Sequence, residues 1–259
     1  MKINLLKLET FLKLPTEANR PYLIHILHLK IKNLGTYGMI TGARYFIAGI
    51  TRKEEAKYGI IDFGYAFEKI ILHLTDLDLG TCWLGGTFKR KGFSDRAGLK
   101  KSEFIPGVTP VGHGRKKRGI KDSAVRMLAG SDRRKSWSKI FFDEDFQSPL
   151  QSDAGEAYGM ALEMVRLGPS ASNMQPWRIV RENNLNFHFF LEKSRAYNKK
   201  PDHQNLQYID MGISMCHFGL TASYLGLEGK WEKAEGIEED SSKYKIPTNT
   251  EYIITWAGR

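Results

Sequence analysis

Two long segments of the chain carry apolar residues at helical spacing, and each predicts a helix that is buried on more than one side. The first segment spans residues 62–83 and the second spans residues 210–231. Both begin at an aspartate, which we expect to cap the helix, and both end in a Leu-x-Leu turn. The apolar positions of the first are Phe63, Ala66, Phe67, Ile70, Ile71 and Leu74.

These two segments align without a gap at an offset of 148 residues. The matched pairs are Asp62 and Asp210, Gly64 and Gly212, Leu72 and Leu220, Leu77 and Leu225, Leu79 and Leu227, and Trp83 and Trp231. Two amphipathic helices can resemble each other by chance. Agreement of the aspartate, the glycine and the tryptophan at one offset favours an internal duplication.

A shorter helix is predicted over residues 157–167, followed by a polar loop and an extended segment over residues 177–180. The predicted apolar face of this helix holds Met160, Ala161, Met164, Val165 and Leu167. Pro169 ends this helix, and the loop then holds four hydrogen-bonding side chains within six residues: Ser170, Ser172, Asn173 and Gln175. Such a loop can bind the edge of a flat polar ring. It can equally be an ordinary connection in which serine and asparagine form the turn.

The two halves of the repeat differ where a site would be expected. At the same offset the polar loop aligns with the apolar stretch 22–27, so the first half lacks it. Conversely, Leu84-Gly85-Gly86 aligns with Glu-Lys-Ala at 232–234, so the second half lacks the paired glycines. Glycines allow backbone to approach a ligand closely. Each half therefore keeps a different part of one site.

Composition indicates a globular protein with a core. The chain has 259 residues, of which 41% are hydrophobic and 12% aromatic. Apolar runs are shorter than the ~18–20 residues of a membrane span, and charges interrupt the N-terminus too often for a signal peptide. Cys82 and Cys216 give neither metal spacing nor a disulfide framework. We expect a reduced, cytoplasmic protein with no metal and no membrane partner.

The net charge of +10 is concentrated in three basic clusters, at residues 89–91, 115–118 and 133–135. Binding of nucleic acid, binding of a phosphate-bearing ligand and a solvated basic surface are the three interpretations. The sequence contains no aromatic-flanked basic repeat, no RNA-recognition signature and no zinc-finger spacing. Nucleic acid is therefore the least favoured partner.

The string from 168 to 177, GPSASNMQPW, resembles the flavin-contacting loop of the nitroreductase family, which carries Pro-Ser-x-x-Asn-x-Gln-Pro-Trp. The matching residues are Pro169, Ser170, Asn173, Gln175, Pro176 and Trp177. Residues 34–38 and 42–46 are also similar to that family, 109–113 resemble the strand that closes its domain, and 132–137 resemble its basic phosphate-contacting segment. The resemblance covers about residues 34 to 259.

The resemblance implies an α+β fold with mostly antiparallel sheets and long central helices. Ordinary members are homodimers whose flavins lie between subunits, and this chain is similar to a fused, pseudo-dimeric subfamily. It implies two tandem nitroreductase-like halves, 1–146 and 147–259, in a pseudo-twofold arrangement, with one composite site and a monomer sufficient. The family's N-terminal Arg-x-Ser-x-Arg has no match in residues 1–35, so that segment is shortened or replaced.

By the same resemblance, FMN carries the chemistry, and no catalytic side chain is required. NADH or NADPH would reduce the flavin at N5, and a nitroaromatic, quinone or similar acceptor would reoxidise it. Arg115 to Arg118 are an alternative phosphate or nicotinamide-cofactor site. The implied cofactor-binding residues are Pro169, Ser170, Ala171, Ser172, Asn173 and Gln175, then Cys82, Trp83, Leu84, Gly85 and Gly86, and Arg133, Arg134 and Lys135.

In the segment 82–86, Cys82 is expected to pack rather than to react. In the segment 168–177, Gln175 and Trp177 are expected to brace the polar loop. Two other hypotheses remain. One is a protein of the same fold that binds a flavin or another ligand with little or no turnover. The other, less favoured, is a basic protein that binds nucleic acid.

Overall fold

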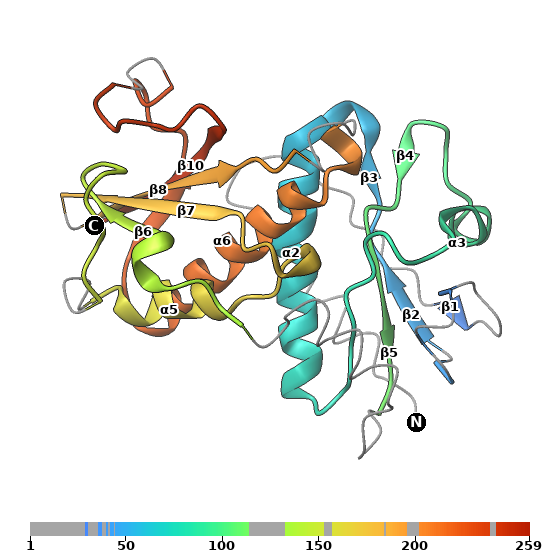
Figure 1. Ribbon diagram of the computed structural model, residues 1–259. Coiled ribbons are helices and arrows are strands. Elements are labelled where there is room, and N and C mark those ends of the chain that lie inside the picture. The colour runs from blue at the N-terminus through green and yellow to red at the C-terminus, as the bar shows by residue number, and fades with distance from the viewer. Residues whose placement is uncertain are drawn as a thin grey trace.

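The computed structural model describes residues 29–30, 36–37, 40, 42–43, 45–113, 133–152, 157–183, 185–195, 202–238 and 242–259. Two long helices, α2 (Ala56–Asp76) and α6 (Leu206–Tyr224), lie side by side at the centre. A sheet flanks them on either side (Figure 1). Within the described residues, no helix is both long enough and apolar enough to span a bilayer.

Both long helices begin earlier than the sequence predicts. Glu55 occupies the N-cap position of α2 without a side-chain bond, whereas Asn205 Oδ1 caps α6 by accepting the N–H of Gln207 at 3.0 Å. The prediction that Asp62 and Asp210 are caps was therefore wrong. The residues just before each aspartate, including Ile60 and Ile209, are buried. Their burial favours a helix that starts N-terminal to the aspartate.

The two helices cross where each has a glycine. A Cβ on Gly64 would lie 2.3 Å from the carbonyl oxygen of Ile209, and a Cβ on Gly212 would lie 1.9 Å from that of Ile61. Backbone therefore packs directly on backbone. Ile61 and Ile209 are related by the same offset of 148 residues as the two glycines, so the contact is reciprocal.

The second half of the chain builds a five-stranded sheet. Its strand order is β6 (Phe141–Asp143), β7 (Trp177–Glu182), β8 (Asn186–Glu192), β10 (Thr250–Gly258) and β9 (Gly229–Glu232). All neighbouring pairs are antiparallel except β6 and β7, which are parallel. β6 precedes the predicted boundary at 146/147, yet its partner strand lies in the second half.

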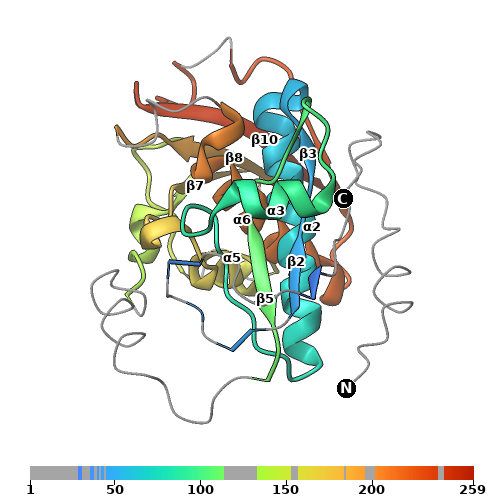
Figure 2. The same cartoon turned by 90° about the vertical axis from the view of Figure 1, so that its right-hand side faces the viewer.

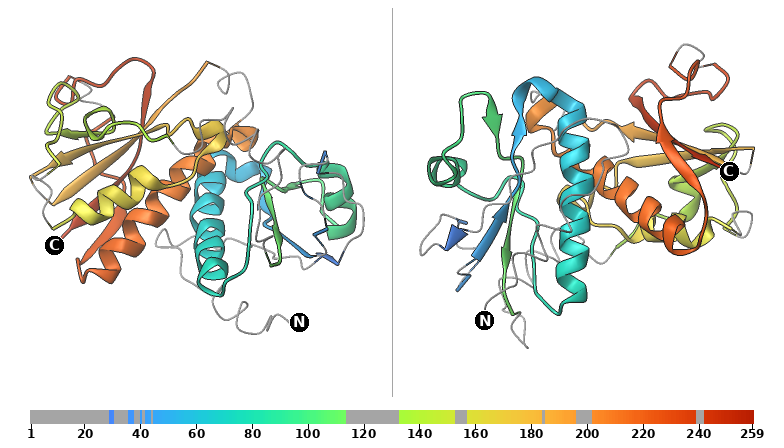
Figure 3. Two further views of the ribbon diagram at one scale, coloured as in Figure 1. Left: turned by 60° about the horizontal axis from the view of Figure 1, so that its bottom comes forward. Right: turned by 180° about the vertical axis from the view of Figure 1, so that it is seen from behind.

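Helices α5 (Gly159–Leu167) and α6 cover one face of this sheet and run beside each other (Figure 3). Phe187 and Phe189 of β8 pack on this side against Phe218 of α6. The predicted apolar face of α5 was partly wrong, because Met160 and Leu167 are exposed. The residues of α5 that enter the core are Ala161, Leu162 and Val165.

The first half places a smaller sheet on the other side of α2. Its order is β1 (Leu29–Lys30), β2 (Tyr45–Ala48) and β5 (Val108–Val111), all antiparallel. A ribbon of β3 (Thr51–Arg52) and β4 (Glu103–Phe104) and the helix α3 (Arg90–Ala97) complete it. Figure 2 views the molecule from this side, with α3, β2 and β5 in front of α2.

The described parts of both halves follow one order: a hairpin, a long helix, and a last strand that returns to the hairpin. In the first half this is β1–β2, α2 and β5, and in the second it is β7–β8, α6 and β10. The segment after each helix also pairs with that last strand. Bridges join Gly80 to Gly112 and Leu84 to Val108, much as β9 pairs with β10.

Candidate functional site

The polar loop 169–175 connects α5 to β7 and has an unusual backbone. Ser172, Asn173 and Gln175 have positive φ angles of 51°, 53° and 47°. Left-handed conformations cost roughly 1–2 kcal/mol for a residue with a Cβ, somewhat less for asparagine. Such a turn persists where surrounding contacts hold it, and clusters of this kind are typical of functional sites.

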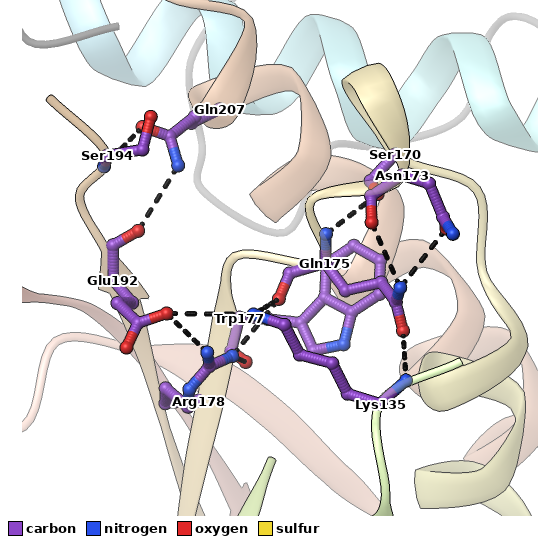
Figure 4. A network of polar contacts seen from close by, with 9 residues as sticks. All are labelled: Lys135, Ser170, Asn173, Gln175, Trp177, Arg178, Glu192, Ser194 and Gln207. Carbon is purple, nitrogen blue, oxygen red and sulfur yellow. Dashed lines mark hydrogen bonds and ion pairs between the residues drawn. The ribbon is translucent and has the colours of Figure 1, made fainter. Parts of the chain in front are cut away.

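Gln175 is the centre of the contacts that hold the loop (Figure 4). Its side chain is 3% exposed, and Nε2 donates to the backbone oxygen of Asn173 at 3.0 Å and to its Oδ1 at 3.1 Å. Oε1 accepts the N–H of Lys135 at 2.8 Å, and the N–H of Gln175 donates to Ser170 Oγ at 2.9 Å. The bracing role expected for Gln175 is therefore observed, and Trp177 is fully buried behind it.

The basic segment 133–135 lies directly against this loop. Asn173 Nδ2 donates to the backbone oxygen of Arg133 at 2.8 Å. Arg134 donates through Nε and Nη2 to the carbonyl of Leu167, at 3.2 and 3.0 Å, and through Nη1 to Asn173 Oδ1 at 3.3 Å. Two segments that the sequence singled out separately therefore form one surface.

A fourth cation, Arg178 on β7, joins this surface, and sequence reasoning missed it. Its guanidinium pairs with the carboxylate of Glu192, which also lies 3.6 Å from Lys135 Nζ. Arg178 Nη1 donates to the carbonyl of Gln175 at 3.0 Å. The available signal was a charged residue between two apolar residues, Trp177 and Ile179, at the start of a strand. Burial lowers the pKa of Arg178.

The pKa of Lys135 is also lowered, first by burial and then by the neighbouring charge of Arg178, against the opposing effect of Glu192. The cationic side chains of Arg134, Lys135 and Arg178 thus share the described network with the carboxylate of Glu192, and exposed Arg133 joins it through its backbone carbonyl. The surplus of positive charge suits an anionic group such as a phosphate.

The glycine turn of the first half packs against the start of α6. A Cβ on Gly85 would lie 2.9 Å from Cδ2 of Leu206, the first residue of α6, and one on Gly86 would lie 4.0 Å from Cδ1. Arg90 fixes the turn by donating from Nη2 to the carbonyl of Gly85 at 2.5 Å and from Nε to that of Ile105 at 3.2 Å. Arg90 belongs to the basic cluster 89–91, so that cluster is not simply a solvated surface.

The residues before the glycines have other roles. Trp83 packs its ring on Phe67 at 4.9 Å, and Leu84 is buried with its backbone N–H and C=O both bonded to Val108. Cys82 is exposed, so the expectation that it packs was wrong. Of the predicted segment 82–86, the glycines are the part that lies against Leu206.

Helix α6 brings the loop and the glycine turn together. Leu206 contacts the turn, and Asp210, one helical turn later on the same face, accepts the N–H of Ala171 at 2.8 Å. Asp210 is 2% exposed, and burial raises its pKa to about 8. Sequence reasoning treated this aspartate as a cap. Its position between buried Ile209 and Met211 was the available signal for an interior acid.

A second link runs between the halves through a buried glutamate. Glu68 of α2 is 2% exposed and accepts from Trp83 Nε1 at 2.7 Å, and His217 Nε2 of α6 lies 2.9 Å from its other oxygen. The ring of His217 lies beside Gly168, where a Cβ would be 3.6 Å from Cδ2. The segment before the polar loop and the segment before the glycine turn are thus connected across both helices.

Other predicted features are not part of this arrangement. Arg115 to Arg118 lie outside the described residues. So do four of the family-like residues, Leu34, Gly35, Gly38 and Arg44. Among the residues that the structure describes, no group of three or more histidine, cysteine, aspartate or glutamate side chains could hold a metal ion.

Comparison with protein families gives a match over most of the chain. The model of the family described as "Putative TM nitroreductase" matches residues 19–222. Among curated proteins, no significant match was found.

Two solved structures share the fold at low sequence identity. One is a protein described as a putative nitroreductase from Thermotoga maritima MSB8, with 17% identity, a TM-score of 0.53, and coverage of 99% of this chain and 85% of that chain. The other, similarly described, is from Anabaena variabilis ATCC 29413, with 9% identity, a TM-score of 0.56, and coverage of 85% of this chain and 70% of that chain. At these identities the likeness concerns the fold.

An FMN-dependent nitroreductase from Clostridium difficile R20291 matches 48% of this chain and 83% of its own, with 20% identity. Its TM-score of 0.37 is too low to support an argument. The fold of this chain is therefore defined by the family match and by the two longer structural matches.

Proposed function

The chain belongs to the family described as "Putative TM nitroreductase", and from that membership we propose that it is an FMN-dependent oxidoreductase. In this proposal NADH or NADPH supplies the electrons, and a nitroaromatic, quinone or similar compound accepts them. The observation that carries the proposal is the meeting of three segments near the start of α6. They are the left-handed loop, the basic segment 133–135 and the turn at Gly85.

The residues present fit the requirements of a flavin mononucleotide. The phosphate needs cations, and the surface of Arg133, Arg134, Lys135 and Arg178 supplies them with one carboxylate among them. The ring needs close backbone approach on one side, which the paired glycines at 85 and 86 allow; a Cβ on Gly85 would lie 2.9 Å from Cδ2 of Leu206. The ring edge needs hydrogen-bonding groups, and the loop 169–175 carries them.

FMN, when bound, supplies the hydride chemistry, so the chain's own residues bind and orient rather than react. Arg134 and Gln175 fix the left-handed turn, and Arg90 fixes the glycine turn opposite it. Both turns are positioned before a ligand arrives, which lowers the ordering cost of binding. A nucleophile or a general base is not required in this arrangement.

The first test is FMN binding, followed by turnover. We expect the purified protein to show flavin absorption or to bind added FMN at one equivalent per chain, and to reduce a quinone with NADH or NADPH. Gly85→Val should weaken FMN binding at least about tenfold, because the added side chain meets Leu206 and narrows the turn.

Gly112→Ala is the matched control, because a Cβ there has nothing within 4 Å. If the wild-type protein binds no FMN, the proposal that FMN is its cofactor is wrong, and a nitroreductase fold without flavin chemistry is favoured. FMN binding without quinone reduction would support the proposed cofactor and contradict the proposed turnover.

We also propose that the two halves form a pseudo-dimer with a single composite site. The reciprocal crossing of Gly64 on Ile209 and Gly212 on Ile61 supports this, as does the shared order of hairpin, helix and returning strand. A monomer carrying one flavin is then sufficient. An obligate dimer by light scattering, or an FMN titration that gives two equivalents per chain, would contradict this arrangement.

We expect FMN affinity to decrease at alkaline pH because Lys135 loses its positive charge. Its pKa is lowered in the folded protein, so its charge is lost below the ordinary lysine value of 10.5. Affinity for the phosphate should therefore be full at neutral pH and fall as pH rises through the lowered pKa. Lys135→Met should weaken FMN binding about tenfold at neutral pH and remove the decrease in affinity at alkaline pH. FMN titration at a series of pH values measures both effects. An unchanged profile would exclude Lys135 from the phosphate site.

A further inference from the structure

The carboxyl group of Asp210 is buried below the polar loop and is only half satisfied. Oδ1 accepts the N–H of Ala171 at 2.8 Å, whereas Oδ2 is buried without a hydrogen-bond partner among the described residues. A buried polar atom without a partner costs stability, and an apolar side chain of similar size avoids that cost. Stability alone therefore does not account for an aspartate at this place.

The position of Asp210 explains what it can control. Ala171 directly precedes Ser172 and Asn173, the first two left-handed residues of the loop. Within the loop, the N–H of Asn173 bonds to the carbonyl of Ser170, and that of Met174 bonds to the carbonyl of Ala171. These bonds shape the turn without fixing it to the rest of the molecule. The bond from Ala171 to Asp210 attaches the turn to α6.

The same part of α6 contacts the other half of the site. Leu206, one helical turn before Asp210, lies against Gly85. On another side α2 crosses α6 at Gly64, where an added Cβ would lie 2.3 Å from the carbonyl oxygen of Ile209. A helix held this closely on both sides is a rigid reference for the loop. Asp210 thus ties the loop to the element that also carries the glycine turn.

We propose that Asp210 is a positioning residue for the cofactor site, holding the Ala171 amide and so keeping the turn at Ser172 and Asn173 oriented to bind FMN. The proposal rests on the function proposed above. It assigns a role to an interior side chain that contacts the loop rather than the cofactor.

Two variants separate this role from a merely structural one. Asp210→Asn keeps an acceptor for Ala171 and resembles the neutral carboxyl, which burial favours by raising the pKa of Asp210 to about 8. Asp210→Leu keeps the branching and the number of side-chain heavy atoms, removes the acceptor and also removes the unsatisfied oxygen. Asp62→Leu is the control, because Asp62 is the equivalent position on α2 at the offset of 148 residues.

Three measurements are made on each full-length variant: FMN affinity, thermal midpoint, and hydrogen exchange of the peptide containing residues 169–175 without ligand. For Asp210→Leu we expect FMN affinity to fall about tenfold or more, faster exchange at Ala171, and a thermal midpoint close to wild type. Asp210→Asn should restore affinity and protection, and Asp62→Leu should change neither.

Equal FMN affinity and equal exchange in Asp210→Leu and wild type would overturn the proposal. Loss of affinity in Asp210→Asn to the same extent as in Asp210→Leu would also overturn it, because the acceptor is then irrelevant. If wild type binds no FMN, the proposed function fails and the cofactor role of Asp210 fails with it. The exchange result still decides whether Asp210 holds the loop.

Discussion

Gly212→Ala is expected to lower the free energy of unfolding by about 3 kcal/mol or more, and to leave much of the protein unfolded or insoluble. The added Cβ would lie 1.9 Å from the carbonyl oxygen of Ile61 and 2.6 Å from the backbone nitrogen of Tyr65. Both are backbone atoms of α2, so no side-chain rotation relieves the contact. The helices must separate, which disturbs the core on both sides. Urea unfolding followed by far-ultraviolet circular dichroism measures the change.

Gly159→Ala is the matched control for this substitution. Gly159 is the first residue of α5, and a Cβ there has nothing within 4 Å. Alanine should be neutral there or stabilise by up to about 1 kcal/mol, because alanine has the higher helix propensity. Gly64→Ala, with 2.3 Å to the carbonyl of Ile209, should resemble Gly212→Ala. If Gly212→Ala behaved like Gly159→Ala, the close crossing of α2 and α6 would be wrong.

Gln175→Leu is expected to loosen the loop and to reduce FMN affinity more than tenfold. The substitution leaves the N–H of Lys135 without its acceptor and removes both bonds to Asn173, so fewer contacts offset the cost of the left-handed turn. Because these groups are largely buried, the free energy of unfolding should fall by about 2–3 kcal/mol as well. FMN titration and urea unfolding of the same sample separate the two effects.

Gln204→Leu provides the comparison, since Gln204 is exposed, precedes α6 and makes none of the hydrogen bonds described for the loop. Its effect on unfolding should stay within about 0.5 kcal/mol. A Gln175→Leu protein with wild-type FMN affinity would show that FMN binding needs no bracing of the loop by Gln175.

The sequence indicated the long helices and the glycines at their crossing, because apolar periodicity and a repeated motif are local properties of the chain. The polar loop and residues 133–135 were recognised separately for the same reason. Asp210 and Arg178 were not recognised, since each acquires its role from a partner far away in sequence, Ala171 for one and Glu192 for the other.

The predicted starts of the two long helices were wrong for a physical reason. An aspartate before an apolar run is a common cap, but here Ile60 and Ile209 lie upstream in the core, and their burial favours continuing the helix. Met160 and Leu167 of α5 are apolar yet exposed, whereas Ala161, Leu162 and Val165 form the buried face of that helix. Apolar character alone did not distinguish the two groups.

The parallel pairing of β6 with β7 means that the chain cannot be cut at 146/147 into two autonomous fragments. Phe141 to Asp143 would leave with the first piece, and the second would expose the free edge of β7 to other chains. The glycine crossing would likewise expose bare helix backbone in each piece. The protein should therefore melt as one cooperative unit despite its two sheets, and its repeats should tolerate insertions in their connections better than physical separation.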